Sequence, residues 1–379
     1  MTYRAMLVVA AILFPSLARA ADPWETIKPY MAPPAEFAGK LGEYRSPLKF
    51  ENGREVKSPE QWAERRKEIL AKWTGVMGAW PAAVAEPRIT VVESVEREGF
   101  TQHKVRVTVA KDRVQRGYLL VPPGATKEKP APAVLVPFYE PETSINVPNE
   151  RTKDLNALTF RAYAYHLAKR GFVTLAIGSP GGDARQPDTA GNATLQPLSY
   201  LAYVAHNCAG ALAARPEVDA KRIGIVGHSY GGKWALFASA LSDRFAAAVW
   251  SDPGIVFDEK RGNVNYWEPW YLGLDPALKE QRKRGVITAD APRTGPYKAM
   301  VEKGMDLHEL HALLAPRPFF VSGGAEDPPA RWIPLNHSVA VNKVLGVEGR
   351  VGMQNRPAHG PNAEANEVVY AFFEHFLKP

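Results

Sequence analysis

One short stretch in the second half of the chain constrains its fold more than any other. Residues 223–232 read Ile-Gly-Ile-Val-Gly-His-Ser-Tyr-Gly-Gly, and a helical pattern follows over 233–241. A buried strand therefore runs into G-x-S-x-G and then into a helix, which is the context of a nucleophile elbow. Gly227 and Gly231 leave room for the sharp turn because they carry no Cβ. We predict that Ser229 is a catalytic nucleophile and that the chain is a serine hydrolase.

The first twenty residues have the pattern of a secretory signal peptide. Arg4 precedes an apolar run over 5–17, and residues 18–20 read Ala-Arg-Ala, which suits a cleavage site. This run is shorter than the ~20 apolar residues that a membrane-spanning helix needs. We therefore expect cleavage after Ala20 and a secreted or periplasmic protein that has no stable membrane anchor.

Composition excludes several other classes. Cys208 is the single cysteine, so neither an intramolecular disulfide nor a thiolate zinc site can form. The formal net charge is +7, but the basic residues are scattered and no aromatic-interleaved basic stripe is present. Nucleic-acid binding is therefore disfavoured. We expect no metal and no organic cofactor, and the sequence leaves the oligomeric state open.

The elements around the serine follow the order of a mostly parallel sheet. Antiparallel opening strands are expected at 89–96, 103–110 and 115–121. Later strands are expected at 133–138, 172–177, 223–226, 246–250, 318–321 and 350–353. Helices are expected at 59–73, 155–170, 198–214 and 363–377. Because strands alternate with helices, we predict an α/β-hydrolase fold with helices on both faces of the sheet.

The same pattern divides the chain into segments. We expect a signal peptide over 1–20, an N-terminal extension over 21–87 and an α/β-hydrolase catalytic domain over 88–379. Within that domain, an insertion at about 253–305 separates the strand after the nucleophile helix from the next element. No internal repeat is present.

A serine nucleophile needs a base and an orienting acid, and in α/β-hydrolases an acid and then a histidine follow it along the chain. Asp327 lies on the loop expected after a late strand, and His359 lies on the loop before the final helix. We predict a triad of Ser229, His359 and Asp327. Two other carboxylates stay open as the acid: Glu326 is adjacent, and Asp252 follows the preceding strand. Their alternative roles are a loop cap and a turn-forming residue.

The tetrahedral oxyanion of acyl transfer needs backbone donors. One should be the Tyr230 N–H, immediately after the serine, and the other should come from the loop after strand 133–138, around Tyr139 or Glu140. That loop lacks the HGGG sequence of many lipases, so the second donor is defined by its position.

Four segments resemble the glucuronoyl esterases and their acetyl-xylan-esterase-like relatives. They are Gly-His-Ser-Tyr-Gly-Gly-Lys at 227–233, Ser-Asp-Pro-Gly at 251–254, the aromatic-rich 263–271, and Asp-Leu-His-Glu-Leu at 306–310 running into Ala-Pro-Arg-Pro at 315–318. The resemblance covers roughly residues 132 to 379. It implies that Lys233 contacts the sugar and that Trp267 lines the same cleft, although a surface lysine and a core tryptophan are the alternatives. The family usually carries arginine directly after the serine, where it assists the oxyanion, and here Tyr230 stands instead.

Together these features predict an exported carboxylic ester hydrolase that acts on a small-molecule or glycan ester. One alternative is a serine peptidase of the prolyl-oligopeptidase type. Such enzymes usually add an N-terminal propeller, for which 24–87 is too short. A second alternative is a catalytically idle glycan-binding homologue, which would not need the whole set of Ser, Asp and His.

Overall fold

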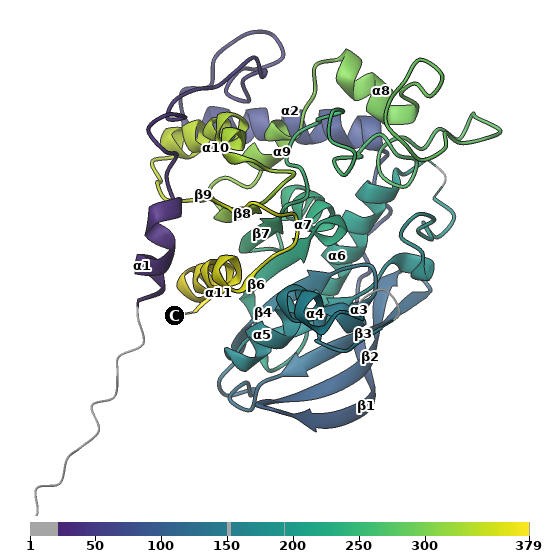
Figure 1. Ribbon diagram of the computed structural model, residues 1–379, viewed down its shortest axis with the longest axis vertical. Coiled ribbons are helices and arrows are strands. Elements are labelled where there is room, and N and C mark those ends of the chain that lie inside the picture. Colours follow the sequence, from purple (N-terminus) through teal and green to yellow (C-terminus); the bar gives the residue numbers. More distant parts are fainter. Residues whose placement is uncertain (1–21, 150–152, 193, 379) are drawn as a thin grey trace, which may run out of the picture.

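The computed structural model describes residues 22–149, 153–192 and 194–378 (Figure 1). The expected signal peptide, 1–20, lies outside the described residues. Among the helices that the structure describes, none combines the length and the apolar character needed to cross a membrane.

A nine-stranded sheet forms the centre of the described chain, in the order β1-β2-β3-β5-β4-β6-β7-β8-β9. Its strands are β1 (Ile89–Arg97), β2 (Phe100–Ala110), β3 (Arg113–Val121), β4 (Ala131–Pro137), β5 (Val173–Ile177), β6 (Val218–His228), β7 (Ala247–Ser251), β8 (Phe319–Gly323) and β9 (Val351–Asn355). The first three strands and the β3–β5 pair are antiparallel, and the pairs from β5 to β9 are parallel. The predicted mostly parallel sheet is confirmed, although β6 begins five residues earlier than expected, where Val218 pairs with Ala131 of β4.

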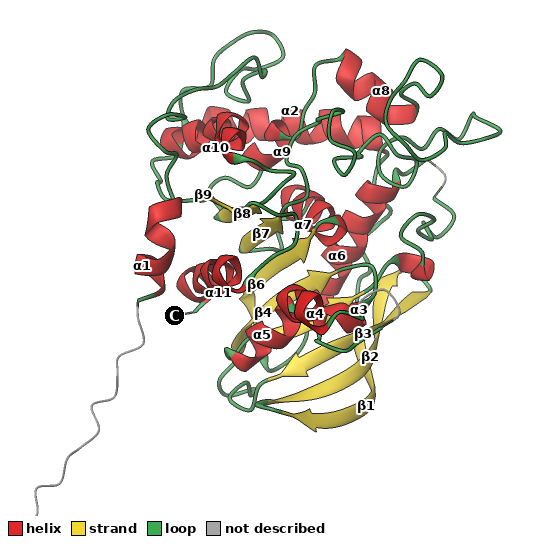
Figure 2. Ribbon diagram, viewed as in Figure 1, coloured by secondary structure: helices red, strands yellow, loops and turns green. Residues whose placement is uncertain are grey.

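Helices lie on both faces of this sheet (Figure 2). They are α1 (Pro23–Ile27), α2 (Pro59–Met77), α3 (Pro141–Ser144), α4 (Leu155–Arg161), α5 (Tyr163–Lys169), α6 (Pro197–Ala213), α7 (Tyr230–Leu241), α8 (Gly295–Glu302), α9 (His308–Ala312), α10 (Trp332–Val344) and α11 (Ala363–Leu377), with 3₁₀ turns η1 (Lys28–Tyr30), η2 (Pro180–Gly182) and η3 (Pro329–Arg331). Side chains alternate along the central strands, so Leu135 packs with α6 and α7 while Val134 and Val136 pack with α5 and α11.

Local sequence signals explain where several helices begin. The Ser58 side chain accepts the Gln61 N–H at 3.3 Å, and Pro59 follows it at the first helical position of α2. Asn362 caps α11 in the same way through the Ala365 N–H at 2.8 Å. The single helix expected at 155–170 is instead two short helices, because Ala162 has a ψ of 55° and leaves the helical backbone.

The N-terminal extension packs against two sides of the sheet and its helices. Near its start, the Trp24 ring lies 4.9 Å from that of His375 in α11. In α2, which ends at Met77 rather than Trp73, the Trp73 Nε1–H donates to the carboxylate of Glu309 in α9 at 2.9 Å. Residues 22–77 therefore contribute to the same folded core as the sheet rather than forming a body of their own.

Parallel strands bring the candidate site together. Because β4, β6, β7, β8 and β9 run in the same direction, the loops that follow them meet at one edge of the sheet. These loops carry, in strand order, Tyr139, Ser229, Asp252, Asp327 and His359.

Candidate active site

Ser229 sits on the turn between β6 and α7, with φ 54° and ψ −111°, a conformation that non-glycine residues rarely adopt. The two glycines are needed at their positions. A Cβ on Gly227 would collide with the backbone of Gly231, and a Cβ on Gly231 would collide with the Pro137 carbonyl oxygen of β4. The Ser229 N–H donates to the Ser251 carbonyl oxygen at 2.8 Å, which fixes the turn to the end of β7. The strand, turn and helix of the predicted elbow are therefore present.

A continuous chain of hydrogen bonds starts at the serine. Ser229 Oγ lies 2.9 Å from His359 Nε2, and His359 Nδ1 lies 2.7 Å from Asp252 Oδ2. Since a carboxylate can only accept, the ring donates from Nδ1 and its Nε2 is left to accept the serine proton. Asp252 is fully buried, and its carboxylate also accepts the N–H groups of Gly324 and Asp327 at 2.6 and 2.9 Å.

Asp327, the carboxylate predicted to orient His359, does not contact it. Its two oxygens accept the N–H groups of Gly254 and Ile255 at 2.9 and 2.7 Å. Burial and the neighbouring Asp252 carboxylate raise the pKa of Asp327 to about 6. The prediction of Asp327 as the histidine's partner was wrong, because the loop after β8 turns back toward the loop after β7 and aims this side chain at backbone.

Glu326, the other open alternative, is also directed away from the histidine. Its Oε1 accepts the Asn263 side-chain amide at 2.9 Å, so it joins the loop after β8 to the insertion. Of the three carboxylates considered from the sequence, only Asp252 contacts His359.

Arg356 holds the histidine loop in place, a role that the sequence analysis missed. Its guanidinium is 6% exposed and donates to the carbonyl oxygens of His359 and Gly360 at 2.7 and 2.8 Å. The same group donates to the Ser322 carbonyl oxygen in β8 at 2.6 Å and reaches Ser251 Oγ in β7 at 3.3 Å. The one sequence signal for this role is position, since Arg356 lies three residues before the histidine.

His228 lies beside His359 but stays neutral. The ring centroids are 4.7 Å apart, and burial holds the pKa of His228 well below its ordinary value. Its Nδ1 lies 3.2 Å from the Ser251 carbonyl oxygen, so it carries the proton that this oxygen accepts. A neutral neighbour places no positive charge against the ring of His359.

The segments predicted to supply oxyanion donors lie side by side. The Tyr139 ring, just after β4, stacks on the Tyr230 ring at a centroid distance of 4.6 Å and an angle of 19°. The buried Tyr230 hydroxyl accepts from Ser179 Oγ at 3.1 Å. The Tyr230 side chain is therefore directed into the core, and the predicted oxyanion donor is its backbone N–H.

Lys233 does not reach a substrate cleft. It is 2% exposed, and its Nζ donates to the carbonyl oxygens of Pro253 and Asn263 at 2.5 and 3.0 Å. Burial lowers the pKa of Lys233 to about 8. The ammonium also lies 4.9 Å from the centre of the Tyr266 ring. The expected sugar contact is corrected: Lys233 fastens the insertion and the loop after β7 to α7.

Trp267 is also buried. None of its surface is exposed, and its Nε1–H donates to the Gly285 carbonyl oxygen at 2.7 Å. Its indole packs near Tyr297, with ring centroids 6.2 Å apart. The prediction that Trp267 lines a cleft was wrong, because the insertion uses this ring for its own small core. Trp270, three residues later, is the half-buried tryptophan of the same cluster.

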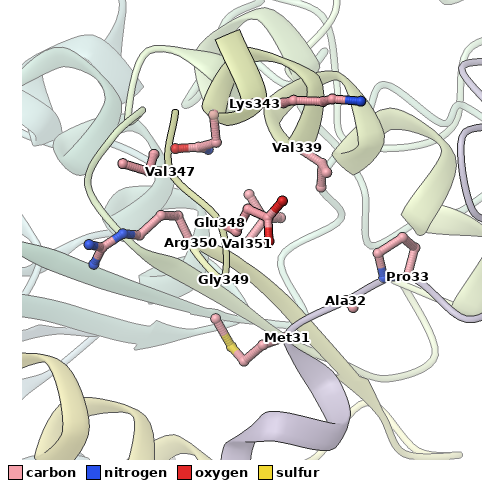
Figure 3. Close-up of a pocket in the computed structure, with 11 residues that line it drawn as sticks. Met31, Ala32, Pro33, Val339, Lys343, Val347, Glu348, Gly349, Arg350 and Val351 are labelled. Atoms are coloured by element: carbon pink, nitrogen blue, oxygen red, sulfur yellow. The ribbon is translucent and has the colours of Figure 1, made fainter. Parts of the chain in front are cut away.

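Two cavities in the described structure differ in their distance along the fold from the candidate catalytic residues. One of about 380 Å³ lies beside Tyr139 and Tyr271, next to the oxyanion segments. Another, of about 200 Å³, lies between the segment after η1 and the loop from α10 to β9, where Met31, Val339 and Val351 line it (Figure 3). None of the candidate catalytic residues lines the second cavity.

One protein-family model matches part of this chain. The model of the prolyl oligopeptidase family matches residues 158–294, which include the elbow. No curated protein matches this chain.

Several solved structures are similar over most of the chain. A glucuronoyl esterase from Solibacter usitatus is 19% identical with a TM-score of 0.66, over 87% of this chain and 97% of that one. A carbohydrate esterase family 15 glucuronoyl esterase from Teredinibacter turnerae is 20% identical with a TM-score of 0.64, over 89% and 92%. A mutant glucuronoyl esterase from Sporotrichum thermophile, solved with methyl 4-O-methyl-β-D-glucopyranuronate, is 17% identical with a TM-score of 0.56, over 88% and 87%. These likenesses confirm the predicted α/β-hydrolase fold.

Proposed function

We propose that this protein is a serine hydrolase that cleaves carboxylic esters of carbohydrates. The observation that carries the proposal is the unbroken hydrogen-bond chain from Ser229 Oγ through His359 to Asp252 at the carboxyl edge of the sheet. The esterases named in the similar structures support ester chemistry on sugars, since they have the same fold.

Acylation starts when Ser229 Oγ attacks the ester carbonyl carbon. His359 Nε2 takes the serine proton and then passes it to the leaving alcohol, which departs with the electron pair of the broken C–O bond. Asp252 holds the Nδ1–H tautomer and stabilises the imidazolium that forms. Its other lone pairs are occupied by backbone N–H groups, so the carboxylate has little freedom to rotate away.

The tetrahedral oxyanion needs donors near Ser229 that are fixed before the reaction. The Tyr230 N–H, at the first residue of α7, and the Tyr139 N–H are the two groups that we assign to this task. The stacked rings of Tyr139 and Tyr230 support the assignment because they hold both backbone segments together. The glucuronoyl esterases that this sequence resembles usually carry an arginine directly after the serine. Here the buried Tyr230 stands at that position, so backbone N–H groups stabilise the oxyanion.

Deacylation repeats these steps with water. His359 Nε2 removes a proton from water, the resulting hydroxide attacks the acyl carbon, and the proton returns to Ser229 Oγ as the acid is released. The arrangement uses no group beyond the side chains and backbone already described.

A second candidate, a serine peptidase, is favoured by the match to the prolyl oligopeptidase family over 158–294. The same triad would serve amide and ester bonds. Turnover of a prolyl anilide in preference to esters would establish this alternative.

We also propose that the protein is exported. The Ala-Arg-Ala sequence at 18–20 supports export, with cleavage after Ala20. The N-terminal sequence of the mature protein from its natural host would test this cleavage.

The test of the proposal is hydrolysis by the purified chain and by Ser229→Ala. The substrate panel is a chromogenic acetate, acetylated xylo-oligosaccharides, a methyl glucuronate ester and a prolyl anilide. We expect turnover of at least one carbohydrate ester and a loss of roughly a million-fold in kcat for Ser229→Ala, as for nucleophile removal in serine proteases.

Ser94→Ala is the matched control, because Ser94 is an exposed serine on the edge strand β1. It should keep the wild-type rate. The proposal fails if Ser229→Ala retains more than about a hundredth of the wild-type rate, or if no ester is cleaved.

A further inference from the structure

The cavity of about 380 Å³ beside the oxyanion segments has no role in the chemistry derived above. Its size lies within the roughly 300–1,000 Å³ typical of small-ligand sites. Residues from three separate parts of the chain line it, among them Tyr139, Arg185, Asn265, Trp270, Tyr271 and Arg284.

This cavity borders a cluster of tyrosines that includes the residue after the nucleophile. Tyr139 lines it and stacks on Tyr230, the residue directly after Ser229. Tyr271, another lining residue, has its ring 6.2 Å from that of Tyr230. A ligand in the cavity would therefore lie against Tyr139 and Tyr271, which pack on the residue next to Ser229.

Two arginines give the cavity its charge. Arg185 and Arg284 are both exposed, and among the described residues neither guanidinium makes a hydrogen bond or an ion pair that would occupy its donors. Arg185 comes from the loop after η2, and Arg284 comes from the insertion. Two cations from distant segments thus line one hollow, and among the described residues that line it Asp183 is the one acid.

The backbone that presents each arginine is fixed. Asp183 Oδ1 accepts the Arg185 N–H at 2.8 Å, which closes a tight turn. On the other side, Arg282 and Glu268 form a buried pair at 3.3 Å, and the same carboxylate accepts the Gly285 N–H at 2.9 Å. Arg284 lies between these two anchored residues.

The remaining lining groups suit a sugar. Trp270 offers a half-buried ring, and aromatic faces pack against the apolar faces of pyranoses. The Asn265 amide and the Asp183 carboxylate can bond to hydroxyl groups. Guanidinium groups bind carboxylates through paired, charge-assisted hydrogen bonds. The cavity lining holds two guanidinium groups and one carboxylate, Asp183, so a carboxylate of the ligand would balance the second positive charge.

We propose that this cavity is a subsite for an acidic sugar, whose free carboxylate is bound by Arg185 and Arg284 while a different, esterified group of the same glycan reaches Ser229. The role of this subsite in substrate selection rests on the proposed ester hydrolysis. The binding itself does not depend on it.

The test measures binding to Ser229→Ala, which cannot turn over a ligand, by isothermal titration calorimetry. The probes are trigalacturonate and the same trisaccharide with its carboxyl groups reduced to hydroxymethyl groups. We expect trigalacturonate to bind at least tenfold more tightly than its reduced form, with an affinity that falls as salt is added. Adding Arg185→Ala and Arg284→Ala should abolish that preference.

Lys283→Ala is the matched control, because Lys283 is an exposed cation next to Arg284 that does not line the cavity. It should leave the preference unchanged. Arg284→Gln alone, which removes the charge but keeps a polar side chain, should reduce the preference severalfold and covers the case in which the double variant misfolds.

Equal binding of the acidic and reduced trisaccharides would overturn the inference, and so would an unchanged preference in the arginine variants. Binding of inorganic sulfate as tightly as trigalacturonate would also overturn it, since the site would then hold an ion and not a sugar. If the wild type cleaves no ester while the charge preference holds, only the proposed function fails. If esters are cleaved without any charge preference, only this inference fails.

Discussion

The loops after β7 and β8 leave neighbouring parallel strands, and each carries a fully buried aspartate. Asp252, in the first loop, accepts from His359, whereas Asp327, in the second, accepts from the backbone of the first loop. The relation is reciprocal, because Asp252 also accepts N–H groups from residues 324 and 327 of the second loop. Each loop therefore fixes the other.

This pairing shows that similar position and burial do not give two carboxylates the same task. Asp252 has a φ of 51°, a left-handed turn that aims its side chain across the edge of the sheet to the histidine loop. Asp327 supports that turn from behind by binding Gly254 and Ile255. We infer that one carboxylate serves the chemistry and the other keeps it in position.

Exchanging each aspartate for asparagine should produce the largest contrast. Asp252→Asn leaves His359 without a carboxylate to select its tautomer, and kcat should fall by about ten-thousand-fold, as in serine proteases. Asp327→Asn leaves Asp252 in contact with His359, and the asparagine keeps one oxygen that can accept a backbone N–H. The kcat of this variant should therefore fall by less than about a hundredfold. Steady-state kinetics on the chromogenic acetate measures both. A larger loss for Asp327→Asn would reverse the assignment.

Arg356→Lys should have the next largest effect, since the guanidinium joins the ends of β7 and β8 to the histidine loop. A lysine cannot make all of these bonds, and we expect kcat to fall about tenfold to a hundredfold while KM changes little. The pH dependence of kcat/KM should shift as His359 becomes less well held.

Arg317→Lys is the control for that change. Arg317 is another largely buried arginine, which donates to the carbonyl oxygens of Ser242 and Phe245 away from the site. It should lower stability without moving the pH profile. If the pH dependence of kcat/KM were the same for Arg356→Lys and wild type, Arg356 would not position His359.

Asp327 should also make stability depend on pH. Its pKa is raised from 3.8 to about 6, so between these values the folded state binds more protons than the unfolded state. Stability therefore falls as pH rises from about 4 to 6, by up to about 3 kcal/mol. Urea unfolding at both pH values should show a smaller change for Asp327→Asn than for wild type. Equal pH slopes would mean that Asp327 titrates at its ordinary value.

Lys233→Met tests the link between the loop after β7 and the insertion, and it should have the smallest effect. Removing the ammonium leaves the Pro253 and Asn263 carbonyl oxygens without a donor, so the free energy of unfolding should fall by about 1–3 kcal/mol. Turnover of the chromogenic acetate should change less than threefold. A selective loss on glycan esters would restore the lysine as a sugar contact.

The fold and the nucleophile turn could be predicted because their signals are local. Gly227 and Gly231 report a turn that admits no Cβ, and the Val- and Ile-rich runs report buried strands. His359 could be found from chain order and its place on the last loop.

The acid and the sugar contacts could not be found in this way because they depend on side-chain direction. Asp252 and Asp327 both follow parallel strands, and only the backbone turn at Asp252 decides which one faces the histidine. Aromatic residues in an insertion can line a cleft or form a core, and the sequence pattern of Trp267 is the same in either case. Arg185 and Arg284 are 99 positions apart, so only the folded chain brings them to one cavity.

The central claim is that Asp252 and His359 activate Ser229, and covalent labelling with a fluorophosphonate tests it most directly. Peptide mapping by mass spectrometry would locate the adduct and give its rate in wild type, Asp252→Asn and Asp327→Asn. The account predicts a single adduct on Ser229, strongly slowed labelling in Asp252→Asn and nearly normal labelling in Asp327→Asn. An adduct on another residue, or wild-type labelling in Asp252→Asn together with loss in Asp327→Asn, would contradict it.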